Sequence, residues 1–333
     1  MNIGVVGAGS WGTSLANVLA KKGYSVQLWA HEAELVEYMR KHRENNQYLP
    51  GISLDRNISF TSALRDTVAH DVVVLVPPSQ LMRSVLKQAA PFFNPDATII
   101  SASKGIENTT LELMSEVINE VLEGHHTQGN AAFISGPTFA REIAQEIPSA
   151  AVVAAENQEV ATMVQDLFST DYFRIYSNDD VVGTEIGGAL KNVVALAAGV
   201  CDGLEYGNNT RAALITRGLA EMKRVGIALG ARAETFAGLA GMGDLVLTCT
   251  GELSRNRTVG IALGEGKKLN DILAHMHMVA EGVETTRSAY QLAKKLKIDV
   301  PIINQMYAVL YEDKDPRDAV IELMRRSLKS EYI

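Results

Sequence analysis

The sequence predicts an α/β domain followed by an all-α helical domain, and two observations carry this prediction. In the first half, short β-branched runs alternate with amphipathic segments. This alternation is typical of a mostly parallel sheet covered by helices on both faces. Further along, the segments become longer, follow helical spacing and include no convincing strand. We therefore expect one domain over residues 1–178 and a helical domain over residues 179–333.

The expected strands are short apolar runs rich in β-branched residues. They are Ile3–Val6, Val26–Trp29, Ile58–Phe60, Val72–Val76, Thr98–Ser101, Ala132–Ser135, Ala151–Ala154 and Phe173–Ile175. The helices expected between them are Thr13–Lys22, Ala33–His42, Gln80–Ala90, Leu111–Leu122, Phe139–Ala144 and Val160–Leu167. The helices expected in the second domain are Val182–Val200, Arg211–Ala228, Phe236–Gly241, Leu245–Thr248, Val259–Leu263, Asn270–His275, Thr285–Lys295, Ile302–Tyr311 and Arg317–Leu328.

Composition excludes several classes of function. The net charge is −8 and no long basic block occurs, so we expect no nucleic-acid partner. The two cysteines lie far apart and the histidines show no metal-ligand spacing, so we expect no metal site and no disulfide framework. The first strand begins directly after Met1, which leaves no room for a signal peptide. The most apolar stretch, Val193–Cys201, is too short to span a bilayer, so a cytoplasmic protein is expected.

The first strand runs into Gly7-x-Gly9-x-x-Gly12, and a helical pattern follows it. Gly7 permits a tight turn, Gly9 lets a pyrophosphate approach the backbone, and Gly12 lets the helix pack closely on the sheet. A glycine-rich turn without a ligand would contain the same letters. The strand before it, the helix after it and the second strand favour a Rossmann-type dinucleotide-binding domain.

The choice between NAD and NADP depends on the residues after the second strand. Ala30 stands where NAD-selective folds place an acidic residue, so repulsion of a 2′-phosphate is missing. His31 could contact that phosphate or stack on adenine, Glu32 argues mildly the other way, and a solvated histidine is equally compatible.

Two further candidates follow later strands. Lys104 lies at the carboxyl end of its strand, where a side chain points into the ligand cleft of a parallel sheet, although a solvated loop lysine would look the same. In Ser135-Gly136-Pro137-Thr138, Gly136 offers a backbone N–H, Pro137 suits a helix start and Thr138 offers a hydroxyl. A plain capped helix is the alternative.

Lys191 and Asn192 lie in a helix otherwise made of small apolar residues. A buried lysine must be paired or shift its pKa downward, which is costly without a function. The alternative is a lysine whose ammonium reaches solvent at the edge of the helix. Because this helix lies where the two domains should meet, the functional interpretation is favoured.

Three segments of the helical domain complete the candidate set. Asp244 lies between glycines and a helical run, as an N-cap that could also form an ion pair. Ser254-Arg255-Asn256-Arg257 concentrates guanidinium groups that suit phosphate, or else forms a solvated loop. Val279-Ala280-Glu281 could close over a cofactor or simply precede a helix.

Taken together, these motifs resemble one family over the whole chain, the NAD(P)-dependent glycerol-3-phosphate dehydrogenases of bacterial type. The matching segments are Gly7–Gly12, Val26–His31, Tyr48–Gly51, Ser103–Gly105, Ser135–Ala140, Leu190–Asn192, Gly238–Asp244, Ser254–Arg257 and Val279–Glu281. Some members carry arginines where this chain has His31-Glu32, which leaves the preference between NADP and NAD open.

The resemblance implies a role for each matched residue. It implies that Lys191 is the catalytic acid and base. It implies that the cofactor, NADP or NAD, contacts Gly7, Gly9, Ser10, Trp11, Gly12, His31, Lys104, Ala140, Arg255, Val279 and Glu281. It implies that the substrate is surrounded by Lys104, Gly136, Thr138, Lys191, Asn192, Asp244, Ser254, Arg255 and Asn256.

The reaction implied by the resemblance is reversible reduction of dihydroxyacetone phosphate to sn-glycerol 3-phosphate, which supplies glycerophospholipid synthesis. Two alternatives remain. Another two-domain hydroxyacid dehydrogenase would share the glycine turn and the lysine but lack the Ser254–Arg257 block. A non-catalytic NAD(P)H-binding redox sensor would need no lysine in an apolar helix. A homodimer is compatible with the apolar helical half.

Overall fold

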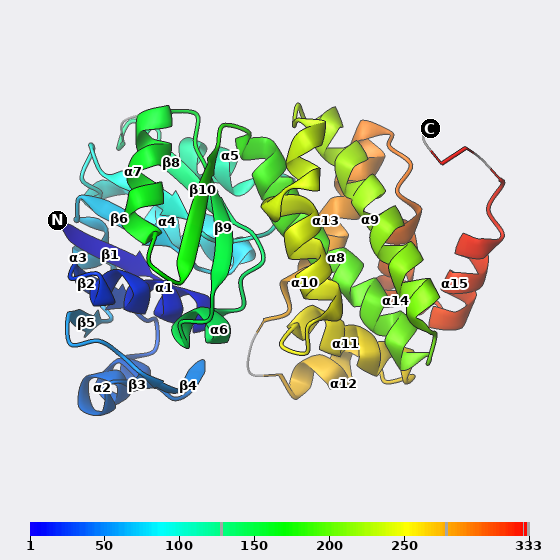
Figure 1. Cartoon of the computed structure of the whole chain (residues 1–333), viewed down its shortest axis with the longest axis horizontal. Coiled ribbons are helices and arrows are strands. Elements are labelled where there is room, and N and C mark those ends of the chain that lie inside the picture. Colours follow the sequence, from blue (N-terminus) through cyan, green and yellow to red (C-terminus); the bar gives the residue numbers. More distant parts are fainter. Residues whose placement is uncertain (127–128, 277–278, 329, 332–333) are drawn as a thin grey trace.

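The computed structural model describes residues 1–126, 129–276, 279–328 and 330–331. The α/β part and the helical part lie end to end, with the amino terminus at the far end of the first (Figure 1). The chain leaves the sheet at Asn178 and enters the long helix α8 (Val181–Gly203) almost at once. Asp180 starts this helix as its N-cap, because its carboxylate accepts a hydrogen bond from the N–H of Gly183 at 2.8 Å.

The α/β part is built on an eight-stranded sheet in the order β10-β9-β8-β7-β6-β1-β2-β5. Its strands are β1 (Asn2–Val6), β2 (Ser25–Trp29), β5 (Ile58–Thr61), β6 (Val72–Leu75), β7 (Thr98–Ser101), β8 (Ala131–Ser135), β9 (Ser149–Ala154) and β10 (Phe173–Asn178). All neighbouring strands are parallel except β8 and β9. The predicted, mostly parallel sheet is confirmed.

Helices cover both faces of this sheet because alternate strand residues point to opposite sides. Val5 packs with one set of helices and Val6 with the other. The first set is α1 (Ser10–Lys21), α2 (Ala33–His42), α6 (Ala140–Ala144) and α7 (Gln158–Phe168). The second set is α3 (Leu64–Val68), α4 (Met82–Ala89) and α5 (Met114–Val121), with the 3-10 turns η1 (Ser79–Leu81) and η2 (Ala90–Phe92) beside α4.

Three short elements were not predicted: α3 and the two-stranded sheet of β3 (Glu44–Asn45) and β4 (Leu49–Ser53). These elements are too short to show a helical or strand repeat in the sequence, and β4 contains Pro50-Gly51, which is typical of a turn. The small sheet supports the glycine turn, because the Asn45 amide donates to the Ala8 carbonyl and to the Thr13 hydroxyl, both at 2.8 Å.

The second part of the chain is helical, as predicted. After α8 come α9 (Asn208–Ala228), η3 (Ala233–Ala237), η4 (Leu239–Gly243), α10 (Asp244–Thr250), α11 (Arg255–Gly264), α12 (Leu269–Ala274), α13 (Glu281–Leu296), α14 (Pro301–Tyr311) and α15 (Pro316–Met324). The expected helix Phe236–Gly241 is instead divided between a 3-10 turn and a π-turn. Helix α15 ends at Met324, before the expected Leu328.

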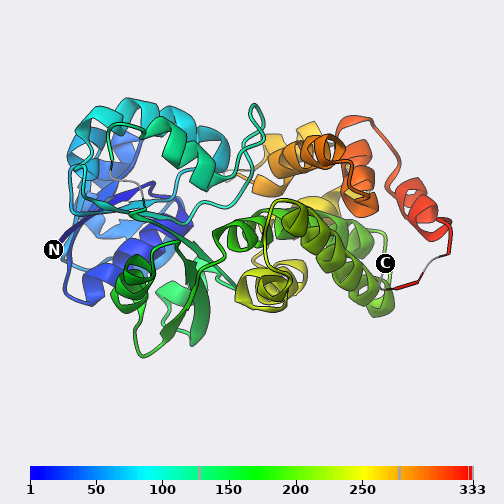
Figure 2. The ribbon, with the colours of Figure 1, turned by 90° about the horizontal axis from the view of Figure 1, so that it is seen from above.

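Helix α8 is the central element of this part and packs against α9, α10, α11 and α13 (Figures 1 and 2). Glycines let α8 and α11 approach closely. A Cβ at Gly199 would lie 2.1 Å from the Arg257 carbonyl oxygen, and one at Gly260 would lie 2.1 Å from that of Leu196. The small residues of α8 are therefore explained by packing.

By length and composition alone, α8 could cross a membrane, since it has 23 residues and an 18-residue window with a mean hydropathy of 1.3. The expectation that the apolar segment is too short to span a bilayer rested only on the shorter stretch Val193–Cys201, and it was therefore wrong. In the structure, 89% of the apolar window is buried inside the protein, which is the environment of a core helix.

Candidate active site

The glycine turn has the backbone shape that the sequence predicts. Gly7 adopts a φ of +114°, and a Cβ at Gly12 would lie 1.9 Å from the Gly7 carbonyl oxygen. These two glycines are required by the fold itself. Gly9 differs, because a Cβ there would meet nothing within 4 Å among the described residues. Gly9 thus leaves open space at the amino end of α1, which no packing constraint explains.

This space suits a dinucleotide. The twelve-residue helix α1 has no acidic residue in its first turn, so its free N–H groups face the space unopposed. Ser10 and Trp11 lie half-buried at its start. In the described part of the chain, the indole Nε1 of Trp11 is buried without a hydrogen-bond partner, so a donor remains available there. The residues present therefore fit the cofactor that the turn predicts.

The residues after β2 differ from the sequence interpretation. Ala30 is only 1% exposed, and its methyl group packs in the core. His31 and Glu32 are the exposed residues at this end of β2. The Glu32 carboxylate accepts a hydrogen bond from the Tyr48 hydroxyl at 3.3 Å. No cofactor choice is therefore inferred from the absence of an acid at position 30. Glu32 is the exposed acidic residue at this end of β2.

Three charged side chains from distant parts of the sequence meet where the two parts of the protein join. The carboxylate of Asp244 accepts from the ammonium of Lys191 at 2.5 Å and from that of Lys104 at 2.8 Å, each at a different oxygen. Lys104 also donates to the Gly136 carbonyl at 3.2 Å. Asp244 is fully buried and Lys191 is 8% exposed, so this group is shielded from solvent. We call it the lysine–aspartate cluster.

The surroundings of Lys191 in the cluster change its pKa. Burial and the neighbouring charge of Lys104 lower its pKa to about 8, against the opposing attraction of Asp244. Burial alone would raise the pKa of Asp244, but the two ammonium groups hold it below its usual value. Both outcomes expected for a buried lysine, pairing and a lowered pKa, therefore occur together.

Asp244 is not the N-cap that its position suggested. It is the first residue of α10, Gly243 precedes it as the cap residue, and its carboxylate is directed to the lysines. Its own helix also contacts the carboxylate, because the Thr248 hydroxyl lies 3.3 Å from Asp244 Oδ1 as well as 2.6 Å from the Asp244 backbone carbonyl oxygen.

Asn192 and Asn256 form a bridge between helices. The Asn256 amide donates to the Asn192 side chain at 2.9 Å, and its oxygen accepts from the N–H of Gly282, also at 2.9 Å. These bonds join α8, α11 and α13 beside the catalytic candidate. Both asparagines are buried, so the structure places them in the scaffold of the site.

The turn after β8 lies beside the cluster. Gly136 has a φ of +129°, and the Thr138 hydroxyl donates to the Gly136 carbonyl at 3.1 Å. The following helix α6 begins at Ala140 with Phe139 as its cap residue, so Pro137 does not occupy the first helical position as expected. Thr138 and Ala140 are half-buried.

The two arginines of the Ser254–Arg257 block have different surroundings. Arg257 donates to Asp202 at 2.7 Å, and Arg211 binds the other oxygen of the same carboxylate. Ser254 is buried and caps α11 by accepting from the Arg257 N–H at 3.2 Å. Arg255 is exposed. Arg255 is therefore the guanidinium of this block that is available to a ligand.

Glu281 connects the two parts of the protein. Its carboxylate accepts from the backbone N–H of Ser79 at 3.1 Å and from the Ser79 hydroxyl at 2.6 Å. Burial raises the pKa of Glu281, against these bonds and the charge of Arg255. Val279 is exposed nearby in sequence. Sequence reasoning missed Ser79, although its place after β6, the neighbour of β1, could have indicated it.

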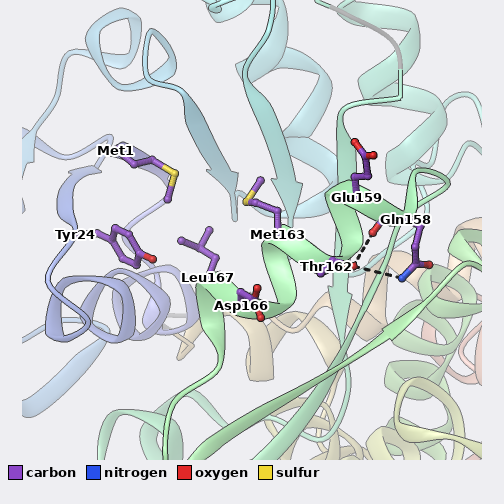
Figure 3. Close-up of a pocket in the computed structure, with 8 residues that line it drawn as sticks. All are labelled: Met1, Tyr24, Gln158, Glu159, Thr162, Met163, Asp166 and Leu167. Carbon is purple, nitrogen blue, oxygen red and sulfur yellow. Dashed lines mark hydrogen bonds between the residues drawn. The ribbon is translucent and has the colours of Figure 1, made fainter.

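A hollow elsewhere on the surface has a different character. It has a volume of about 520 Å³ and lies beside Met1, Tyr24 and one face of α7 along most of its length (Figure 3). This is the side where β1 begins, whereas ligands of parallel α/β sheets bind where strands end. Met163 and Leu167 contribute apolar surface there, and none of the candidate site residues lines it.

The fold and the site together define a two-domain dehydrogenase that uses a nicotinamide dinucleotide. Two family models match, described as the amino-terminal and carboxyl-terminal parts of NAD-dependent glycerol-3-phosphate dehydrogenase, over residues 2–161 and 180–321. The chain belongs to the glycerol-3-phosphate dehydrogenase family, as the resemblance in the sequence indicated.

Individual relatives agree over the full length. A glycerol-3-phosphate dehydrogenase [NAD(P)+] of Syntrophotalea carbinolica is 61% identical over 332 residues, which is 99% of both chains. The crystal structure of glycerol-3-phosphate dehydrogenase from Coxiella burnetii has a TM-score of 0.93 at 39% identity and covers 98% of this chain and 99% of its own. The corresponding enzyme of Saccharomyces cerevisiae has a TM-score of 0.82 at 30% identity, with the same coverage.

Proposed function

We propose that this protein reduces dihydroxyacetone phosphate to sn-glycerol 3-phosphate reversibly with NADPH or NADH, and that Lys191 is the proton donor and acceptor. The observation that carries the proposal is the buried contact between Lys191 and Asp244 at the junction of the two parts. A buried, paired lysine is costly unless it is used. The product is a precursor of glycerophospholipids, so we place the enzyme in membrane-lipid synthesis.

The proton chemistry follows from the cluster. The nicotinamide of the bound cofactor supplies or accepts the hydride. As the carbonyl oxygen of the substrate gains negative charge, the Lys191 ammonium is the acid that protonates it. In the oxidative direction, neutral Lys191 takes the proton back. A pKa of about 8 makes both forms accessible near neutral pH.

Lys104 and Asp244 have opposite effects on this step. Lys104 favours loss of the proton from Lys191, and Asp244 favours its retention. Lys104 is 14% exposed in its side chain and contacts the Gly136 carbonyl, so it lies between the cluster and the turn after β8. We propose that it also faces the substrate and that Thr138 and the Gly136 backbone line the same space.

Arg255 is the residue we assign to the phosphate. The protein carries a net charge of −8, so a dianionic substrate needs a local cation. Arg257 is held by Asp202, whereas Arg255 is exposed. Ser254, Asn192 and Asn256 hold the surrounding helices in place, and we assign them to the walls of the substrate site.

We assign the cofactor to the turn and the residues around it. Its pyrophosphate would be held at Gly7, Gly9 and Gly12 and by the start of α1, with Ser10 and Trp11 beside it. The remaining positions proposed to line the cofactor are His31, Lys104, Ala140, Arg255, Val279 and Glu281.

The two alternatives from the sequence are less well supported. A redox sensor would not need the lysine–aspartate cluster. Another two-domain hydroxyacid dehydrogenase would lack the Ser254–Arg257 block, which supplies the exposed Arg255. We also propose that the domains divide between residues 178 and 179, that the enzyme acts in the cytoplasm without membrane insertion or nucleic-acid partners, and that it forms a homodimer.

The direct test follows NADPH or NADH absorbance with purified protein and dihydroxyacetone phosphate. Rapid oxidation of the nucleotide and formation of sn-glycerol 3-phosphate are expected. Unphosphorylated dihydroxyacetone is the matched control and should be a very poor substrate. Equal rates with both ketones, or no turnover with either nucleotide, would refute the proposed substrate class. Size-exclusion chromatography with light scattering tests the homodimer.

A further inference from the structure

A small cavity lies directly behind the lysine–aspartate cluster, where β7 and β8 end and α8 begins. About 10 Å³ of it is reachable by the centre of a water molecule. That is room for about one water. Lys104 and Glu185 are both among the residues that line this cavity.

The walls of the cavity carry hydroxyl groups that lack partners. Ser101, Ser135 and Thr184 line it, and their hydroxyl oxygens are buried without a hydrogen bond to any described residue. Three unpartnered hydroxyls around one cavity are costly unless something inside binds them. A water molecule needs two to four polar partners, and this cavity offers them.

The cavity connects to the cluster along one face of α8. Thr184, Gly188 and Lys191 are spaced four and three residues apart, so they share a stripe of the helix. A Cβ at Gly188 would lie 2.7 Å from the Ser135 hydroxyl and 3.4 Å from the Lys104 side chain. Because residue 188 is a glycine, the Ser135 hydroxyl and the Lys104 side chain can lie against α8 at this point. Gly188 lies between Glu185 and Lys191 in the sequence of the helix.

Glu185 is a buried carboxyl group that the mechanism above does not use. It accepts from the Ser115 N–H at 3.0 Å and from the Ser115 hydroxyl at 2.5 Å, at the start of α5. Burial raises its pKa to about 7, against these bonds, and the nearby charge of Glu116 acts in the same direction as burial. Its charge thus changes near neutral pH.

We propose that the cavity is a permanent water site and that, through this water, the carboxyl group of Glu185 is hydrogen-bonded to Lys104 and controls when Lys191 loses its proton. Glu185 is thus a positioning residue, since it acts through the cluster. This inference rests on the role proposed for Lys191. Within the cluster, Asp244 pairs with both lysines, and the Cys249 thiol lies near it with a pKa that burial raises to about 12, so the thiol stays neutral.

The sign of the effect follows from the charges. Above pH of about 7, Glu185 is negative and stabilises the positive charge of the two lysines. Below that pH it is neutral and has little influence. Removing the carboxylate therefore lowers the pKa of Lys191, and the effect is larger at alkaline than at acidic pH.

The test compares Glu185→Gln with the unmodified full-length enzyme. Glutamine retains a hydrogen-bond acceptor for the Ser115 N–H and a donor for its hydroxyl, so the start of α5 remains satisfied. The matched control is Glu221→Gln. Glu221 is also a buried carboxyl whose pKa burial raises to about 7, but it binds the N–H groups of Ile302 and Ile303.

Two quantities are measured against pH. The first is kcat for ketone reduction, which falls as Lys191 loses its proton. The second is the 13Cε chemical shift of Lys191 in 13C-lysine-labelled protein without cofactor, which reports the charge directly. In Glu185→Gln both midpoints should move to lower pH by about 0.5 unit or more, with matching kcat values near pH 6. Glu221→Gln should leave both midpoints in place.

Each outcome decides the inference. If both midpoints remain in place in Glu185→Gln, the proposal is wrong. If the 13Cε midpoint shifts and the kcat midpoint does not, the link between Glu185 and Lys191 is supported, but Lys191 is not the proton donor. A shift in kcat alone overturns the link. If Glu185→Gln fails to fold, Thr184→Val decides, because it removes one hydroxyl at nearly constant volume. It should produce a smaller shift in the same direction, and no shift would overturn the water site.

Discussion

The glycine turn and the lysine–aspartate cluster are built in opposite ways. The turn is formed by consecutive residues, and Gly7 and Gly12 are fixed there by backbone geometry alone. The cluster is formed by Lys104, Lys191 and Asp244, which lie on three separate elements and meet only when both parts of the chain have folded. The pyrophosphate site proposed at the turn is therefore a local property of the sequence, whereas the proton transfer proposed for the cluster depends on tertiary structure.

The largest effect is expected from breaking the cluster. Lys191→Ala should lower kcat by about 10²–10⁴-fold, which is the usual contribution of a general acid or base. NADPH binding, followed by fluorescence, should change little because the turn is untouched. Lys191→Arg is the matched variant, since it keeps a charge beside Asp244 but cannot release a proton at neutral pH.

The arginine variant separates two explanations for that loss. Activity as low as that of Lys191→Ala identifies proton transfer as the function of the residue. Recovery of most of kcat in Lys191→Arg would show that only its charge is needed. Loss of NADPH binding together with kcat would contradict the separation between turn and cluster.

The second effect concerns the phosphate. A hydrogen bond to a charged group contributes about 1.5–3 kcal/mol, so Arg255→Ala should raise the KM for dihydroxyacetone phosphate by about ten- to a hundred-fold. Arg255→Lys should recover only part of this, because an ammonium lacks the two-pronged contact. Arg257→Ala is the control. It breaks the contact with Asp202, so it should lower the melting temperature. The KM for dihydroxyacetone phosphate should rise much less than in Arg255→Ala.

Unphosphorylated dihydroxyacetone completes this comparison. Its slow reaction should be nearly the same in Arg255→Ala and in the unmodified enzyme. Equal losses with both ketones would place Arg255 in folding or cofactor binding and remove the physical support for a phosphate-bearing substrate.

The difference between the two regions also explains what the sequence could predict. The strands, the glycine turn and the helical second half are local patterns, and they were predicted with small boundary errors. Each member of the cluster was identified, but Asp244 was interpreted as a helix cap because its partners lie 53 and 140 residues away. The bond from Glu281 to Ser79 spans 202 residues and was missed.

The inference from Ala30 failed for a related reason. A position at the end of a strand can point into the core or into the cleft, and the sequence alone did not show which. Ala30 points into the core. Likewise, Glu185 looks like an ordinary helical residue until β7, β8 and α5 are placed around it.

The turn itself allows a sharper comparison between fold and binding. Gly12→Ala places a methyl group against the Gly7 carbonyl, so we expect a clear loss of thermal stability and of NADPH binding. Gly9→Ala meets open space and has a φ of −65°, which alanine adopts easily. It should fold normally but weaken NADPH binding about ten-fold. Unchanged NADPH affinity in Gly9→Ala would mean that the pyrophosphate does not approach this residue.

The smallest effect is expected at Glu32. Its carboxylate is exposed beside the end of β2, near the place proposed for the adenosine ribose, and it would repel a 2′-phosphate. Exposed charges contribute up to about 1 kcal/mol, so Glu32→Gln should raise the ratio of kcat/KM for NADPH over NADH by about two- to five-fold. The exposed Glu34 of α2 supplies the control variant Glu34→Gln, which should change the ratio less.

Salt gives an independent check on this electrostatic explanation. Raising the ionic strength screens exposed charges, so the difference between Glu32→Gln and the unmodified enzyme should shrink at high salt. Both nucleotides should support turnover in every variant. A preference for NADH that persists in Glu32→Gln at low salt would show that another group discriminates against the 2′-phosphate, and His31, exposed beside Glu32, would be the next residue to replace.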